Sequence, residues 1–128
     1  MTNRPKQQGT AWETALCRVL NAIPGVDAER LAEAGCNDLG DIRILTAGLP
    51  PIVVEAKARE RLSLHEALSA ARRKAHPHDA VIAWRRLVRR QPDHVRRQTA
   101  GDGPIIAMSL SLFCDLLAAC SSVEEAVG

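Results

Sequence analysis

Two short apolar runs joined by a turn constrain the fold of this chain more than any other feature of the sequence. Residues 52–56 are mainly β-branched and apolar and follow two prolines, which predicts a strand buried on much of both faces. Residues 41–45 alternate between polar and apolar side chains, and residues 46–50 contain the glycine and proline that are typical of a turn. We therefore predict an antiparallel hairpin formed by residues 41–46 and 52–57.

This hairpin carries charged residues at the ends of its strands. Side chains alternate along a strand, so Glu55 and Lys57 point to the same face. Asp41 joins that face only if it lies opposite one of these two residues and not opposite Ala56. Such a register requires the turn to centre on position 48 or 49, unless a β-bulge shifts the pairing.

Two carboxylates and a lysine on one face are suited to phosphodiester hydrolysis. Mg²⁺ prefers oxygen ligands in an octahedral shell and keeps several waters, so Asp41, Glu55 and the backbone carbonyl of Ala56 are a sufficient protein contribution. The ion polarises the phosphate and acidifies a bound water. Lys57 is suited to orienting that water and to offsetting the charge that develops on the phosphate. We expect Mg²⁺ as the cofactor, Mn²⁺ as a substitute, and no organic cofactor.

A third acid, Glu13, lies near the predicted start of the first helix, residues 10–22. Apolar residues recur there at three- or four-residue spacing, and the pattern ends before Pro24. Thr10 and Glu13 have the spacing of a capping box, in which the glutamate reaches back to the Thr10 backbone N–H. The local sequence favours this structural role, and the alternative is that Glu13 is an active-site acid.

Three motifs occur in a fixed order: G-T-x-x-E ending at Glu13, G-D-I around Asp41, and V-E-x-K ending at Lys57. Followed by a helix and another strand, they resemble the PD-(D/E)xK nuclease superfamily. More closely, the chain is similar to the archaeal-type Holliday junction resolvases and to short resolvase-like proteins encoded by phages of actinobacteria. The phage group is also similar in Lys6-x-x-Gly9, Ala28-Glu29-Arg30 and Asp38-x-Gly40-Asp41, and the resemblance covers residues 4–117.

The resemblance implies a restriction-endonuclease-like α/β fold, with a mixed sheet flanked by helices. It implies an active site formed by Glu13, Asp41, Glu55 and Lys57, with metal held by the three acids, and so favours the catalytic role for Glu13. It also implies a homodimer that cuts four-way DNA junctions. Gly40 stands where the superfamily name has proline, as in the resolvase branch itself. Ala58 stands where many members have a small polar residue, which leaves nearby phosphate contacts open.

The rest of the sequence predicts further elements of an α/β core. We expect a helix from the capping-box residues Ser63 and Glu66 to about Ala75, and Ser109 or Ser111 as the cap of a last helix. The strands expected are residues 79–84, residues 104–108 and, on the family resemblance, an early strand within 26–34.

At 128 residues the chain has the size of one domain, which we take as a single nuclease domain over 1–128. Residues 1–8 and 118–128 are expected to be flexible ends. No stretch approaches a membrane span and no signal-peptide pattern opens the chain, so we expect a cytoplasmic protein, in a bacterium or a phage-infected host.

Cysteines and histidines give weaker indications of a site. The cysteines lack C-x-x-C spacing, so they are interpreted as mostly buried thiols, with a disulfide or a metal site as the alternative; they are Cys17, Cys36, Cys114 and Cys120. His76 and His78 flank a proline and are interpreted as part of a solvated turn, with a metal pair as the alternative.

The net charge of +2 is divided unevenly along the chain. Residues 1–56 hold five Lys and Arg against seven acids, residues 57–97 hold twelve against four, and residues 98–128 hold none against four, giving balances of −2, +8 and −4. The basic segment has the electrostatic character of a protein that binds a phosphate backbone. Its cations at 72–74 are explained equally well by a helix dipole. We expect DNA contacts from Lys6, Arg59, Arg61, Arg85, Arg86, Arg89 and Arg90.

These observations predict a metal-dependent endonuclease for branched DNA. The first alternative is a nuclease of the same fold that acts on linear duplex, flap or single-stranded DNA in repair or restriction. The second is a non-catalytic DNA-binding module. For the last helix, packing on the sheet is favoured over a dimer interface; the apolar residues concerned are Leu110, Leu112, Phe113, Leu116 and Leu117.

Overall fold

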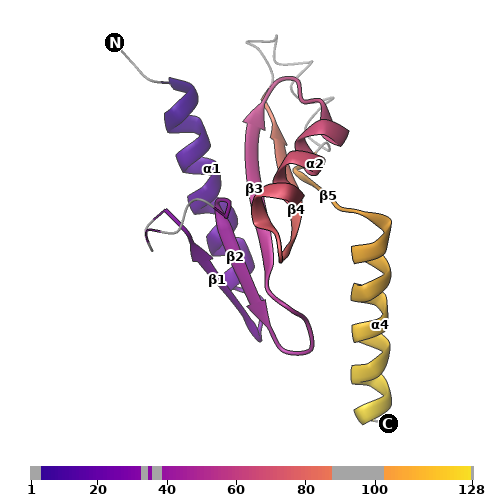
Figure 1. Ribbon diagram of the computed structural model, residues 1–128. Helices are drawn as coiled ribbons and strands as arrows, with labels where there is room; N and C mark the ends of the chain where they lie inside the picture. Colours follow the sequence, from indigo (N-terminus) through magenta and orange to yellow (C-terminus); the bar gives the residue numbers. More distant parts are fainter. Residues whose placement is uncertain (1–3, 33–34, 36–38, 88–102, 128) are drawn as a thin grey trace.

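The computed structural model describes residues 4–32, 35, 39–87 and 103–127 of the chain. Three helices and five strands make up this described part, in an order that can be followed along the chain in Figure 1. The elements are α1 (Arg4–Asn21), β1 (Val26–Arg30), β2 (Ile42–Thr46), β3 (Ile52–Arg59), α2 (Leu64–Ala75), β4 (Asp79–Arg86), β5 (Ile105–Ala107) and α4 (Leu110–Val127).

The five strands form one mixed sheet in the order β1-β2-β3-β4-β5. β3 and β4 are parallel and are connected through α2, whereas the other neighbouring strands are antiparallel. α1 and α2 lie against opposite faces of the sheet (Figure 1). The predicted α/β class, with a mixed sheet flanked by helices, is therefore confirmed.

The central strand β3 is buried on both faces, as its apolar sequence predicts. Val54 packs with Trp12 on the α1 side, and Val53 packs with Ala71 on the α2 side. The indole N–H of Trp12 donates a 3.0 Å hydrogen bond to the backbone carbonyl of Ala83 in β4, which fixes α1 across the middle of the sheet. The rigid core thus supports the side chains that follow Val54 along β3.

α1 begins at Arg4, six residues before the predicted start at Thr10. Pro5 lies in the first turn, where a missing backbone N–H costs nothing because that group has no partner within a helix. Thr10 is therefore inside the helix, where it cannot act as the N-cap. The capping-box interpretation of Glu13 is wrong for this physical reason.

α2 spans the predicted residues, but the side chain of its N-cap residue, Ser63, makes no capping hydrogen bond. The predicted capping box is therefore not formed there. Ser109 does cap α4: its Oγ accepts a 3.1 Å hydrogen bond from the backbone N–H of Leu112. The early strand β1 and the strands β4 and β5 also occur where they were expected.

α4 extends away from the sheet (Figure 1). Leu112 is its buried residue among the side chains that the structure describes, so the prediction that its apolar residues pack on the sheet holds for only part of the helix. Cys114 and Cys120 are exposed free thiols, which corrects their interpretation as buried, while Cys17 is half-buried and Cys36 lies outside the described residues. No helix in the described part of the chain is both long and apolar enough to cross a membrane.

Candidate active site

The register of the β2–β3 hairpin decides whether Asp41 shares a face with Glu55. Ile42 pairs with Val54 and Ile44 with Ile52, and the ladder ends one position before Asp41 would lie opposite Glu55. This register centres the turn on Gly48, and beyond the ladder the N–H of Asp41 donates to the carbonyl of Val54, which departs from regular pairing with Glu55. The turn position that the prediction requires is therefore observed, whereas the pairing of Asp41 with Glu55 stays a prediction.

Gly40 allows the chain before Asp41 to approach β3 closely. Its φ of +150° lies in a region that residues with a side chain rarely adopt. A Cβ atom built at this position would lie 2.3 Å from Cγ1 of the fully buried Val53 and 3.2 Å from Oε2 of Glu55. Proline, with φ fixed near −65°, does not fit this backbone.

Three hydrogen bonds to backbone groups of other residues fix the position of Asp41. Its N–H donates to the carbonyl of Val54 over 3.1 Å, and its carbonyl accepts from the N–H of Leu31 over 2.9 Å. Its Oδ2 accepts a 2.8 Å hydrogen bond from the N–H of Ala56. The amide of Ala56 is thus the group in contact with Asp41, and metal coordination by the Ala56 carbonyl stays a prediction.

Glu55 has one engaged and one unpartnered carboxylate oxygen. Oε1 forms a 3.6 Å ion pair with Nζ of Lys74, in the last turn of α2. Oε2 is buried and has no hydrogen-bond partner among the residues described. Burial raises the pKa of the Glu55 carboxyl above its ordinary value and the charge of Asp41 raises it further, whereas Lys74 and Lys57 lower it.

Lys57 follows Glu55 on the same face of β3 and is half-buried. Its ammonium is close enough to Glu55 to lower the pKa of that carboxyl. In the parallel ladder, Lys57 lies opposite Trp84, whose indole N–H donates a 2.9 Å hydrogen bond to the carbonyl of Arg59. The end of β3 that carries the lysine is therefore tied to β4.

Glu13 approaches this acidic pair from α1, on the other side of the sheet. It forms a 3.5 Å ion pair with Arg30 of β1, and both side chains are 17% exposed. Burial raises the pKa of Glu13, the charges of Asp41 and, more weakly, of Glu55 add to this, and Arg30 opposes it. The structure thus brings Glu13 into the electrostatic field of both predicted metal ligands.

The three acids do not share a single centre in this arrangement. No group of three or more Asp, Glu, His or Cys side chains within the described ranges is close enough together to hold a metal ion. Each carboxylate has its own partner: Glu13 has Arg30, Glu55 has Lys74, and Asp41 has a backbone N–H. The residues nevertheless fit a divalent cation, because the unpartnered Oε2 of Glu55 lies beside a second carboxylate and hard cations bind such oxygens.

Basic residues continue from this site along the ends of β3 and β4. The parallel register sets Ala58 opposite Arg85 and Arg59 opposite Arg86, and Arg61 follows directly. These four arginines of the predicted DNA surface, Arg59, Arg61, Arg85 and Arg86, are all exposed. The side chain of Lys6 is outside the described part, as are Arg89 and Arg90.

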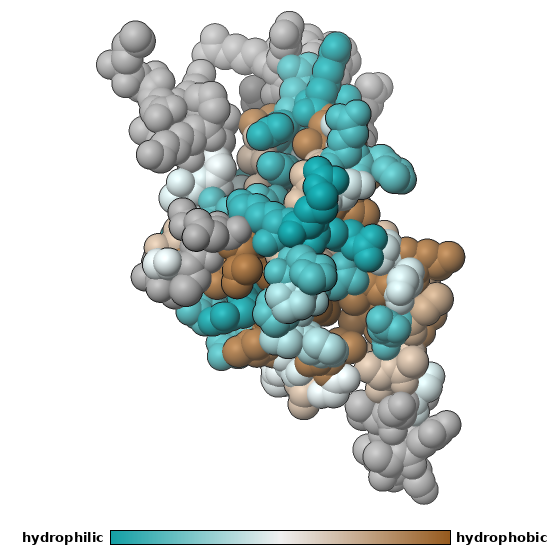
Figure 2. Space-filling view, in the orientation of Figure 1, coloured by the Kyte–Doolittle hydropathy of each residue, from teal (hydrophilic) through white to brown (hydrophobic). Residues whose placement is uncertain are grey.

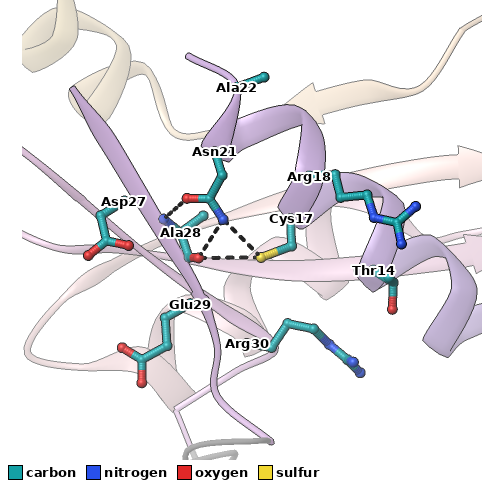
Figure 3. Close-up of a pocket in the computed structure, with 9 residues that line it drawn as sticks. All are labelled: Thr14, Cys17, Arg18, Asn21, Ala22, Asp27, Ala28, Glu29 and Arg30. Carbon is teal, nitrogen blue, oxygen red and sulfur yellow. Dashed lines mark hydrogen bonds between the residues drawn. The ribbon is translucent and has the colours of Figure 1, made fainter. Parts of the chain in front are cut away.

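A pocket of about 940 Å³ opens between α1 and the free edge of β1 (Figure 3). The Asn21 side chain closes part of this edge: its Nδ2 donates to the carbonyl of Ala28 over 2.9 Å, and its Oδ1 accepts from the N–H of Ala28 over 2.8 Å. The thiol of Cys17 donates to the same carbonyl. Arg30 lines this pocket and pairs with Glu13, so the pocket adjoins the acidic site.

Two residues of the site were not among those predicted from the sequence. Arg30 was noted only as part of a family motif, and Lys74 was assigned to the helix dipole. A signal for Lys74 exists in the spacing of α2, because Ala71 and Ala75 are buried against the sheet face that carries Glu55 and Lys74 lies between them. His76 and His78 lie in a turn, as expected.

A comparison with known proteins finds no matching family model, no matching curated protein and no matching solved structure.

Proposed function

We propose that this chain is a metal-dependent DNA endonuclease of the PD-(D/E)xK superfamily that cleaves branched DNA in the manner of a Holliday junction resolvase. The observation that carries the proposal is the buried, unpartnered Oε2 of Glu55, next to Asp41 and on the same face as Lys57. An unsatisfied buried oxygen costs about 1–3 kcal/mol, and more when it is charged. A strand end without a ligand gains nothing from a buried oxygen that lacks a partner, whereas a cation site uses such an oxygen as a ligand.

Asp41 and Glu55 would hold Mg²⁺ or Mn²⁺, with Glu13 completing the site directly or through water and the carbonyl of Ala56 as a further ligand. The bound ion supplies polarisation of the phosphate and an acidified water. Lys57 orients the attacking water and offsets the negative charge that develops on the phosphate. Backbone hydrogen bonds fix Asp41 and the sheet fixes Glu55, so these two ligands are preorganised.

The arginines at the ends of β3 and β4 support DNA as the substrate. Arg59, Arg85 and Arg86 lie on two adjacent parallel strands, one or two positions beyond Lys57 or its ladder partner Trp84. Exposed arginines on a rigid sheet end can contact consecutive phosphates of one strand. A DNA backbone held there would reach Lys57 and the acidic pair.

A homodimer is part of the same proposal, because resolution of a four-way junction requires two cuts. Large apolar side chains are exposed at the start of α4 and on β5, and Figure 2 shows hydrophobic residues gathered in that part of the molecule. Exposed apolar surface of this kind is typical of an interaction site. The residues are Ile105, Ile106, Leu110, Phe113 and Leu117.

The test is cleavage of a labelled four-way junction in Mg²⁺, compared with linear duplex, flap and single-stranded DNA. Asp41→Asn and Lys57→Ala should each lower the cleavage rate by about 100-fold or more, since each removes a charge that acts on the transition state. Asp27→Asn is the matched control, because Asp27 is exposed on β1 and away from the acidic pair.

The other outcomes contradict the mechanism or favour a different function. Undiminished cleavage by Asp41→Asn contradicts the mechanism. DNA binding by the wild type without any cleavage in Mg²⁺ or Mn²⁺ favours the non-catalytic DNA-binding module. Faster cleavage of linear duplex, flap or single-stranded DNA than of the junction assigns the chain to repair or restriction chemistry on that substrate.

A further inference from the structure

Lys74 contacts the acidic pair from an element that neither acid belongs to. It lies in the last turn of α2, and its Nζ is 3.6 Å from Oε1 of Glu55 in β3. α2 packs on the sheet through Ala71 and Ala75, which holds the Lys74 backbone beside the site. The contact is therefore set by the packing of a helix on a sheet.

The two partners of this ion pair are held to different degrees. The side chain of Glu55 is 13% exposed, whereas that of Lys74 is 43% exposed. Their separation of 3.6 Å is longer than the roughly 2.7–2.9 Å of a strong charged hydrogen bond. An ammonium on a flexible four-carbon stem can leave such a contact without any change in the backbone. Glu55 is thus the fixed partner and Lys74 the exchangeable one.

The ion pair with Lys74 and the nearby charge of Lys57 leave part of the Glu55 carboxylate without a partner. Its Oε2 is buried without a hydrogen-bond partner in the described part of the chain, and the charge of Asp41 is close by. A divalent cation placed between the two carboxylates would neutralise both. Lys74 and such a cation therefore compete for the same carboxylate.

We propose that Lys74 is an exchangeable counter-ion, which neutralises Glu55 in the protein without a divalent ion and moves to a DNA phosphate when such an ion binds. This role rests on the proposed function, because it needs both a cation at Glu55 and a phosphate beside it. One ammonium serves two partners in turn. Binding of the ion and binding of DNA are then positively coupled, and the coupling is reciprocal.

The test compares the wild-type chain with Lys74→Met and with the matched variant Arg73→Met. Methionine keeps an unbranched side chain and removes the charge. Arg73 is an exposed cation on the same helical turn with no ion pair to Glu55, so it controls for the loss of one positive charge. Mn²⁺ binding to the DNA-free proteins is measured from the electron paramagnetic resonance signal of the free ion. Lys74→Met should bind Mn²⁺ more tightly than the wild type, by about 5-fold or more, and Arg73→Met should not.

The second measurement is the affinity for a fluorescent four-way junction at constant ionic strength, with and without Ca²⁺. Gel electrophoresis confirms that the junction stays intact. Ca²⁺ should tighten junction binding by the wild type and by Arg73→Met by about 5-fold or more, a typical coupling factor. Lys74→Met should lose most of this gain.

The outcomes separate this inference from the proposed function. If the wild type binds Mn²⁺ but Lys74→Met changes neither the Mn²⁺ affinity nor the Ca²⁺-dependent gain, the exchange role is refuted and the nuclease proposal stands. Equal effects of Lys74→Met and Arg73→Met also refute it, because a general charge effect then accounts for both. If the wild type binds no Mn²⁺, or binds it no better than Asp41→Asn, the proposed function is refuted and this inference with it.

Discussion

Replacing Gly40 with alanine should destabilise the fold and displace Asp41. The added Cβ would lie 2.3 Å from Cγ1 of Val53, a distance at which one of the two groups must move. The side chain of Val53 is fully buried between the sheet and α2, so it has no free space to enter. Overpacking of this kind costs about 1–3 kcal/mol. The φ of +150° adds strain of about 1–3 kcal/mol for a residue other than glycine.

The two contributions together predict a loss of about 2–6 kcal/mol in the free energy of unfolding, measured by urea denaturation with an unchanged slope. Gly48→Ala is the matched control, because Gly48 also has a positive φ, +87°, but no atom lies within 4 Å of its added Cβ. It should cost only the backbone term, about 1–2 kcal/mol. The difference between the two variants measures the contact with Val53.

A double-mutant cycle with Val53→Ala identifies the contact directly. Removing Cγ1 creates space for the new methyl group, so the double variant should be more stable than the sum of the single effects by about 1 kcal/mol or more. Gly40→Ala should also weaken Mn²⁺ binding, since the displaced backbone carries Asp41. Equal stability of Gly40→Ala and Gly48→Ala, or strictly additive effects in the cycle, would refute the reasoning.

The remaining predictions concern stability. Glu55→Gln should raise the free energy of unfolding at pH 7 by about 1 kcal/mol, the scale of a buried unsatisfied group. Burial and then the neighbouring acid raise its pKa above 4.5 in the folded protein, so ionisation destabilises the fold as pH rises through that pKa, and the gain should shrink as pH falls toward 4.5. Asn21→Ala removes both side-chain hydrogen bonds to Ala28 and should cost about 1–2 kcal/mol in urea denaturation, with more self-association in size-exclusion chromatography because the edge of β1 is opened. Trp12→Phe leaves the carbonyl of Ala83 without the indole donor and should lower the free energy of unfolding by about 1–2 kcal/mol. The measurement is thermal denaturation, and an unchanged melting temperature would contradict the importance of that bond.

The sequence predicts the hairpin and limits its register to a few possibilities, because both depend on local rules. The alternation of side chains fixes the faces of β3, and the turn glycine, Gly48, limits the possible pairings to a few. The pairing that centres the turn on Gly48 is one of those few, and the structure has it. The strands at 79–86 and 105–107 follow in the same way from short apolar runs, whereas the early strand at 26–30 was expected only from the family resemblance.

The errors arise where distant segments decide the outcome. The local pattern T-x-x-E predicts a cap at Thr10, but Pro5 starts the helix earlier and leaves Glu13 in its interior. Cys114 and Cys120 belong to an apolar helix that is only partly covered by the sheet, and the helical pattern alone cannot reveal how far the covering extends. The ion pair between Lys74 and Glu55 depends in the same way on how α2 packs.

The site combines carboxylates that the fold holds in place with counter-ions that come from other elements. Asp41 is held by backbone groups of two other segments, and Glu55 is part of the central strand, so neither depends on a side-chain partner for its position. Arg30 and Lys74 neutralise the acids from other elements through ion pairs of 3.5 and 3.6 Å. A cation that replaced them would therefore need no rearrangement of the sheet, because only side chains would have to move. This division explains how the fold keeps several acids close together, with each one paired to a partner from another segment.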